Sequence, residues 1–117
     1  MSIHSRVTQD RRRLSRLIAM LGCEFTFKQV THNATIVNLS IRGAFLSSNF
    51  LPPIGGAVRV FFQSPRMKTP LALDGVVVRG GWGMSERGEV SRFGVRFNSS
   101  PVELISLLHT LIPNPGT

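Results

Sequence analysis

The sequence is poor in cysteine, tyrosine and acidic residues. Cys23 is the only cysteine among 117 residues, which excludes an internal disulfide and a cysteine-based metal cage. There is no tyrosine, one tryptophan (Trp82) and only six Asp and Glu residues. The three histidines lack metal-ligand spacing, and no two acids stand in an arrangement recognisable as general acid and base. We therefore expect no metal, no cofactor and no enzymatic activity.

Long apolar runs are also missing. No stretch approaches the ~18 apolar residues that a membrane-spanning helix needs. The N-terminus does not have the pattern of a signal peptide either. We therefore expect a cytoplasmic protein without membrane insertion. A chain of this length is expected to form one domain, and it can bury roughly two thirds of its unfolded surface.

Positive charge is abundant, and most of it is arginine. Fourteen Lys and Arg residues, twelve of them Arg, give a formal net charge of +8. Arginine carries a planar fork of donors that fits phosphates and the edge of guanine, and it stacks on bases. A high arginine content is also common in GC-rich genomes, so composition alone does not decide. The charge predicts an anionic partner that carries phosphate or nucleobase.

Short apolar or alternating segments separated by glycine and proline predict strands. The expected strands are 23–28, 34–40, 43–48, 57–62, 71–79 and 93–97, with turns at Val30–Asn33 and 85–91. Val76–Val78 suggests burial on both faces or the end of a strand inside a barrel, and Gly80–Gly83 is expected to break the strand. Six or seven short strands and a final helix predict an all-β-dominated fold. This is a small six-stranded antiparallel β-barrel with a C-terminal α-helix and a mobile basic N-terminal arm.

The last segment has the pattern of a helix. Ser100, Pro101 and Glu103 form a capping box with proline at the first helical position, and Pro113 ends the helix. Its wide apolar face must cover either one mouth of the barrel or a partner chain.

The N-terminal segment is basic, with four arginines between positions 11 and 16. It has two possible structures, a helix with its apolar stripe at Leu14, Leu17, Ile18 and Leu21, or a loop that leads into a long bent first strand. Gly22 limits the helix, so we favour the loop. We expect residues 1–16 to form the arm and residues 17–113 to form the barrel and helix.

The stretch Asn38–Gly43 lies between two apolar runs, and its residues alternate in polarity. In a strand, this alternation puts Asn38, Ser40 and Arg42 on one face and the apolar residues on the other. Gly43 permits a bend or a close approach. The polar row is a candidate binding surface, although Asn38 and Ser40 could instead satisfy the backbone of a turn.

Two motifs together resemble the PilZ domain of bacteria. Arg12 and Arg16 form Arg-x-x-x-Arg, and Asn38, Ser40 and Gly43 form Asn-x-Ser-x-x-Gly about 25 residues later. The resemblance extends over 11–112, through the strand patterns at 55–62, 73–79 and 93–97.

The resemblance implies a six-stranded barrel that binds cyclic di-GMP, a bacterial second messenger with two phosphates and two guanines. It assigns ligand binding to Arg12, Arg16, Asn38, Ser40 and Gly43. Arg42 extends the polar row. Arg11 adds a third basic fork, and in the family an arginine there tends to accompany two stacked ligand molecules.

The implied mechanism is a switch. The ligand orders the arm over the barrel, and the changed surface signals to an unidentified protein partner that controls motility, adhesion or exopolysaccharide. Two alternatives remain open, a basic barrel that binds nucleic acid and a PilZ-like interaction module that no longer binds ligand. Few exposed aromatic residues are expected for base stacking, which argues against nucleic acid. The intact motifs argue against a module that has lost its ligand.

Overall fold

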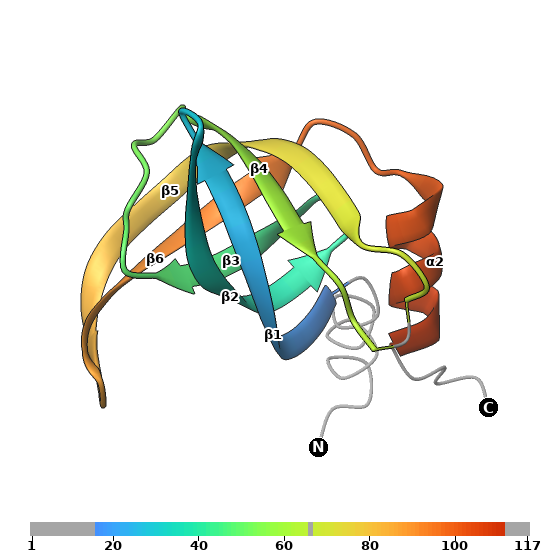
Figure 1. Ribbon diagram of the computed structural model, residues 1–117, viewed down its shortest axis with the longest axis horizontal. Helices are drawn as coiled ribbons and strands as arrows, with labels where there is room; N and C mark the ends of the chain where they lie inside the picture. The colour runs from blue at the N-terminus through green and yellow to red at the C-terminus, as the bar shows by residue number, and fades with distance from the viewer. Residues whose placement is uncertain (1–15, 66, 112–117) are drawn as a thin grey trace, which may run out of the picture.

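The computed structural model describes residues 16–65 and 67–111. This part of the chain forms six antiparallel strands and one helix. In chain order they are β1 (Arg16–Phe27), β2 (Val30–Ser40), β3 (Gly43–Ser48), β4 (Ala57–Phe62), β5 (Leu71–Ser85), β6 (Gly88–Phe97) and α2 (Val102–Leu111). The strands close into a barrel in the order β1-β2-β3-β6-β5-β4 (Figure 1). The predicted barrel with a C-terminal helix is confirmed. Of the arm predicted over residues 1–16, residues 1–15 lie outside the described residues, whereas Arg16 already belongs to β1.

The barrel closes around side chains that alternate along each strand. In β4, Val58, Val60 and Phe62 are buried while the residues between them are exposed. This period of two places every second side chain inside, as a strand requires. Phe25 and Phe93, both fully buried, meet edge to face with 5.1 Å between ring centroids at the centre of this core. The interior is therefore a packed core.

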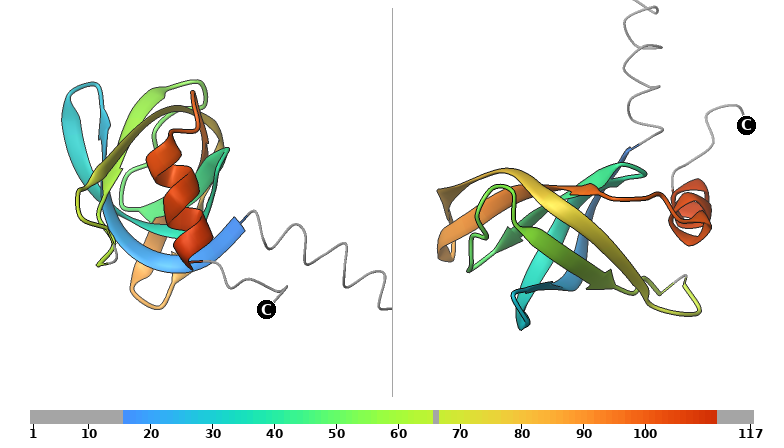
Figure 2. Two further views of the ribbon diagram at one scale, coloured as in Figure 1. Left: turned by 90° about the vertical axis from the view of Figure 1, so that its right-hand side faces the viewer. Right: turned by 90° about the horizontal axis from the view of Figure 1, so that it is seen from above.

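Helix α2 covers one end of the barrel (Figure 2). Leu104, Leu107 and Leu108 are buried, and their i, i+3, i+4 spacing places them on one helical face. This apolar face was expected to cover either a mouth of the barrel or a partner chain, and the structure shows that it covers the barrel.

The predicted capping box is wrong. The first helical hydrogen bonds are accepted by the carbonyl of Pro101, so the helix begins at Val102. The hydroxyl of Ser100 instead donates to the carbonyl of Ile41, at 2.6 Å. The start of the helix is therefore tied to the turn between β2 and β3.

The turn predicted at Val30–Asn33 is also misplaced. The chain reverses at Lys28 and Gln29, whose φ values are +49° and +68°, and β2 already begins at Val30. Two successive positive φ values match the twist of a two-residue hairpin. Neither residue is a typical turn former, so the sequence carried no signal at this position.

Gly80–Gly83 does not break its strand, contrary to the prediction. β5 continues to Ser85 because β6 pairs with it residue by residue, and the chain turns at positions 86 and 87. Backbone hydrogen bonds hold this ladder and do not need side chains. The distal part of the β5–β6 hairpin projects away from the barrel, at the end opposite α2 (Figures 1 and 2).

Of the two alternatives predicted for Val76–Val78, burial on both faces is not found. Val77 is buried at 1% exposure, whereas Val78 is 43% exposed. The register of β5 on β6 shifts between Val77 and Arg79, so Val78 is the extra residue of a β-bulge. The bulge turns Arg79 to the outer face.

The first strand begins at Arg16, which supports the loop-to-strand interpretation over the helical one for residues 16–22. β1 pairs with β2 along its length and with β4 near its C-terminal end. Its register on β2 shifts between Ile18 and Leu21. This irregularity accounts for the bend expected in a long first strand.

Candidate ligand-binding face

The turn between β2 and β3 is built around the hydroxyl of Ser40. This oxygen accepts hydrogen bonds from the amides of Arg42 and Gly43, and its proton is donated to the carbonyl of Gly43, each at 3.3 Å. The amide of Phe97 donates to the carbonyl of Arg42, at 2.8 Å. Ser40 therefore does satisfy the backbone of a turn, and Arg42 lies in this turn beyond the end of β2. These bonds hold the turn in one geometry.

Gly43 is required by packing against the neighbouring strand. A Cβ atom built there would lie 2.1 Å from the carbonyl oxygen of Val95. The close approach expected at Gly43 is therefore made by the backbone of β6. Without a side chain at this position, β3 and β6 pair closely beside the turn.

Four strands align one residue each into a row across the outer face. Arg79 of β5 is opposite Gly94 of β6, Gly94 is opposite Phe45 of β3, and Phe45 is opposite Asn38 of β2. The guanidinium of Arg79 lies over the ring of Phe45, 5.7 Å from its centroid. This is within the range of a cation–π interaction. An arginine, an aromatic ring and an amide thus follow one another on one surface.

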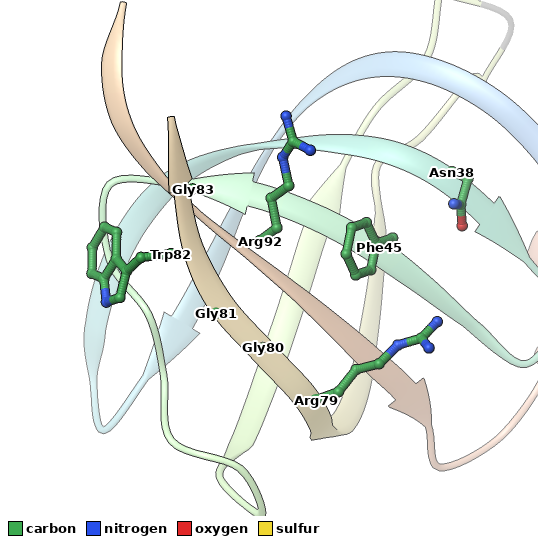
Figure 3. A pocket seen from close by; sticks show the side chains of 8 residues that line it. All are labelled: Asn38, Phe45, Arg79, Gly80, Gly81, Trp82, Gly83 and Arg92. Carbon is green, nitrogen blue, oxygen red and sulfur yellow. The ribbon is translucent and has the colours of Figure 1, made fainter. Parts of the chain in front are cut away.

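Two depressions flank this row. The first, about 600 Å³, runs along the glycine-rich part of β5 to Arg92 (Figure 3). The second, about 400 Å³, reaches the turn with Ser40, Arg42 and Gly43. They share Asn38, Phe45 and Arg79, so they form one continuous groove across the strands.

The groove is lined by basic residues and by no acidic residue among those described. Arg42, Arg79, Arg92 and Arg96 are exposed and line one or both depressions. In residues 16–65 and 67–111, the ion pair present is Arg59–Asp74, which does not line the groove. Four arginines without a carboxylate partner in this part of the chain make a surface suited to phosphate.

The residues predicted from sequence are partly brought together. Asn38, Ser40, Arg42 and Gly43 line the smaller depression, and Arg16 pairs with Ser40 across β1 and β2. The second arginine of the first motif therefore begins its strand beside the second motif. Arg11 and Arg12 lie outside the described residues.

The amide of Asn38 differs from the hydroxyl of Ser40. No other group among the described residues bonds the Asn38 side chain, which is half-buried at the edge of both depressions. An amide offers both a donor and an acceptor, which is the pattern needed to read the edge of a base. Of these two residues, Asn38 is thus the one available to a ligand.

Trp82 lies at the rim. Its side chain is 52% exposed, and it projects from β5 away from Phe45 and Arg79 (Figure 3). It is neither a core residue nor stacked on the row.

Four residues of the groove were missed in the sequence, namely Phe45, Arg79, Arg92 and Arg96. A signal existed for the last two, since Phe93, Val95 and Phe97 face inward and the residues between them must face outward. For Arg79 there was none, because the bulge at Val78 reverses the alternation.

The described residues carry no other chemistry that the groove could use. They hold no group of three His, Cys, Asp or Glu that could bind a metal. Burial raises the pKa of the Cys23 thiol to about 12, so it is a protonated core residue at neutral pH. None of the described helices is long and apolar enough to cross a bilayer. The arrangement is that of a binding surface for an anionic, planar ligand.

Several solved structures of other proteins share the fold of this chain. No curated protein matches the chain in sequence. The structure of the Bacillus subtilis inhibitor of motility, MotI/DgrA, is 14% identical with a TM-score of 0.60, covering 84% of this chain and 46% of that one. The Borreliella burgdorferi PlzA protein, in complex with c-di-GMP, is 15% identical with a TM-score of 0.56, over 89% and 47%. This chain therefore spans about half the length of these two proteins.

A third structure matches over most of both chains. The PilZ domain of YcgR from Escherichia coli, with c-di-GMP, is 13% identical with a TM-score of 0.62, over 83% of this chain and 85% of that one. At such identities the likeness shows the fold. The family model of the PilZ domain matches residues 10–112 of this sequence, nearly its whole length. The chain belongs to the PilZ domain family.

Proposed function

We propose that this protein is a bacterial, cytoplasmic receptor for cyclic di-GMP and not an enzyme. The observation that carries the proposal is the arginine-lined groove, in which the amide of Asn38 lines both depressions. Cyclic di-GMP presents two phosphates and two guanines. Arginine matches both groups, and an amide can pair with the edge of a guanine. Two PilZ structures similar in fold, those of PlzA and YcgR, contain this ligand.

The proposed site has a part on the barrel and a part on the arm. Asn38, Ser40, Arg42 and Gly43 belong to the barrel, with Ser40 and Gly43 shaping the turn. Arg11 and Arg12 belong to the predicted arm, and Arg16 begins β1 where the arm joins the barrel. In the proposal, these three arginines contact phosphate and guanine from the other side. The described residues 16–65 and 67–111 form the barrel and its covering helix. The ligand orders the arm over the barrel, and a protein partner recognises the changed surface.

Calorimetric titration of the purified full chain with cyclic di-GMP tests this proposal, with cyclic di-AMP and GTP as comparison ligands. We expect saturable binding to cyclic di-GMP, and its stoichiometry counts the ligand molecules per site. Arg12→Ala and Arg16→Ala should each weaken binding by about 10- to 150-fold, because a charge-assisted contact contributes ~1.5–3 kcal/mol. Arg59→Ala is the matched control, since Arg59 pairs with Asp74 outside the groove.

Trp82 offers an independent measurement. It is the only tryptophan, there is no tyrosine, and it lines the larger depression. Its fluorescence should change on binding and saturate at the same ligand concentration as the heat. Absence of heat and of a fluorescence change at tens of micromolar ligand would refute the proposal. Binding to DNA of any sequence, lost steeply with salt and unaffected by Asn38→Ala, would instead indicate a nucleic-acid-binding barrel.

A further inference from the structure

We propose that Arg79, positioned by Gly94 against the ring of Phe45, is a preformed stacking platform for a base of the ligand. The inference rests on the proposed function and assigns a specific contact within that site. It concerns a residue outside both sequence motifs. It follows from the cross-strand row and from the space that one glycine leaves in that row.

The side chain of Arg79 crosses its neighbouring strand above Gly94. A Cβ atom built on Gly94 would lie 3.4 Å from both Cγ and Nε of Arg79 and 3.7 Å from Cδ1 of Phe45. The arginine therefore already touches the place where any side chain would begin. Gly94 is buried although it lies on the outer face of the strand, because the stem of Arg79 covers it. A Cβ alone would make ordinary van der Waals contacts here, whereas the atoms of a side chain that extends beyond Cβ would compete with the arginine for this space.

The other end of Arg79 is held by the aromatic ring. Its guanidinium carbon is 5.7 Å from the Phe45 centroid, and no carboxylate among the described residues competes for it. Contact with the ring restrains the guanidinium while the residue remains exposed. A planar, restrained and solvent-facing cation is a surface on which a base can stack, and less side-chain freedom is lost on binding.

The neighbours of the platform match the other parts of a nucleotide. Asn38 ends the same row, where its amide can meet the edge of a base that lies over Phe45 and Arg79. Arg92 and Arg96 stand two residues before and after Gly94 on β6 and face outward. At ~3.4 Å per residue, their backbones bracket the row at about 7 Å on either side. The base would occupy the row and phosphate the flanks.

The substitution Arg79→Lys separates stacking from charge. Lysine keeps the positive charge but loses the planar face, so cyclic di-GMP should bind on the order of 10-fold more weakly, the typical size of one base-stacking contact. The salt dependence of binding should stay unchanged, because the number of cations is the same. Arg59→Lys makes the same chemical change outside the groove and should leave the affinity unaltered.

Gly94→Val tests the positioning role. The valine side chain would occupy the path of the Arg79 stem, and valine is favourable in a strand. We expect a loss of affinity similar to that of Arg79→Lys. The double variant should be no weaker than either single variant, because both changes remove the same contact. Urea unfolding of each variant checks that the barrel is intact. If Gly94→Val does not fold, the affinity of Arg79→Lys alone decides whether Arg79 stacks on the ligand.

The outcomes separate this inference from the proposed function. If the wild-type protein does not bind cyclic di-GMP, both fail. If the wild type binds and Arg79→Lys binds equally well, the stacking platform alone is refuted. A loss in Arg79→Lys that is accompanied by an equal loss in Arg59→Lys also refutes it.

Discussion

Gly43→Ala provides a direct test of how the second motif is held. The added Cβ would lie 2.1 Å from the carbonyl oxygen of Val95, and real Cβ contacts are essentially never shorter than 3.0 Å. β3 and β6 must therefore separate locally by about 1 Å, since the obstacle is backbone and cannot rotate away. This displaces the first pair of the ladder, Gly43 with Arg96, and the adjacent bond from the Phe97 amide to the Arg42 carbonyl.

The magnitude follows from these two effects. Overpacking of this kind costs roughly 1–3 kcal/mol. Weakening one or two hydrogen bonds adds about 1 kcal/mol. We therefore expect Gly43→Ala to lower the free energy of unfolding by about 2–4 kcal/mol. Ligand affinity should fall with it, because the turn that holds Ser40 is displaced.

Urea unfolding followed by far-UV circular dichroism measures this loss. Gly81→Ala is the matched control, because a Cβ there meets nothing within 4 Å and the position has no positive φ. It should be neutral or stabilising by up to ~1 kcal/mol, through the reduced freedom of the unfolded chain. If Gly43→Ala and Gly81→Ala unfold at the same urea concentration with the same slope, the packing explanation for Gly43 is wrong.

Three further predictions concern the core and one surface pair. The Cys23 thiol should not react with a disulfide reagent at pH 8 in the native protein, because burial raises its pKa to about 12. It should react fully once urea unfolds the protein. Fast labelling of the native protein would contradict this. Leu104→Ala should lower the free energy of unfolding by about 2–5 kcal/mol, because Leu104 is fully buried. Val102→Ala is the control and should change it little, because Val102 is 72% exposed. Equal urea midpoints for the two variants would show that α2 does not cover the core. Arg59 lowers the pKa of Asp74, so the pair stabilises the fold above the unfolded carboxyl pKa of ~4 and ceases to do so as the pH falls through the lower folded pKa. The free energies of unfolding of the wild type and of Asp74→Asn should therefore converge in acid. A difference that stays constant with pH would contradict this.

Sequence patterns predicted the barrel because its strands depend on local alternation. Val58, Val60 and Phe62 alternate with exposed residues, and a strand is the structure that buries every second side chain. The final helix was predictable from its i, i+3, i+4 leucines. The elements that were misplaced lack such signals, since Lys28 and Gln29 are poor turn formers and Gly80–Gly83 relies on pairing with β6.

Some residues of the candidate site were likewise predictable from the sequence, and others were not. Asn38, Ser40 and Gly43 were identifiable from their order and spacing, and Arg92 and Arg96 from the inward residues beside them. Arg79 was not identifiable, because counting by twos from Leu73 through Val77 places it inside the barrel. A bulge at Val78, visible in the register of β5 on β6, moves it outward.

The sequence by itself determined the strands, the closing helix, the excess of arginine and the order of the two motifs, because each depends on residues close together in the chain. The tertiary structure alone decided that Arg79, Gly94, Phe45 and Asn38 form one row. Their alignment depends on the register of four strands, which shifts between Val77 and Arg79 on β5 and between Ile36 and Asn38 on β2. Register is a property of pairing between distant segments, and a shift of one residue would turn each side chain to the opposite face.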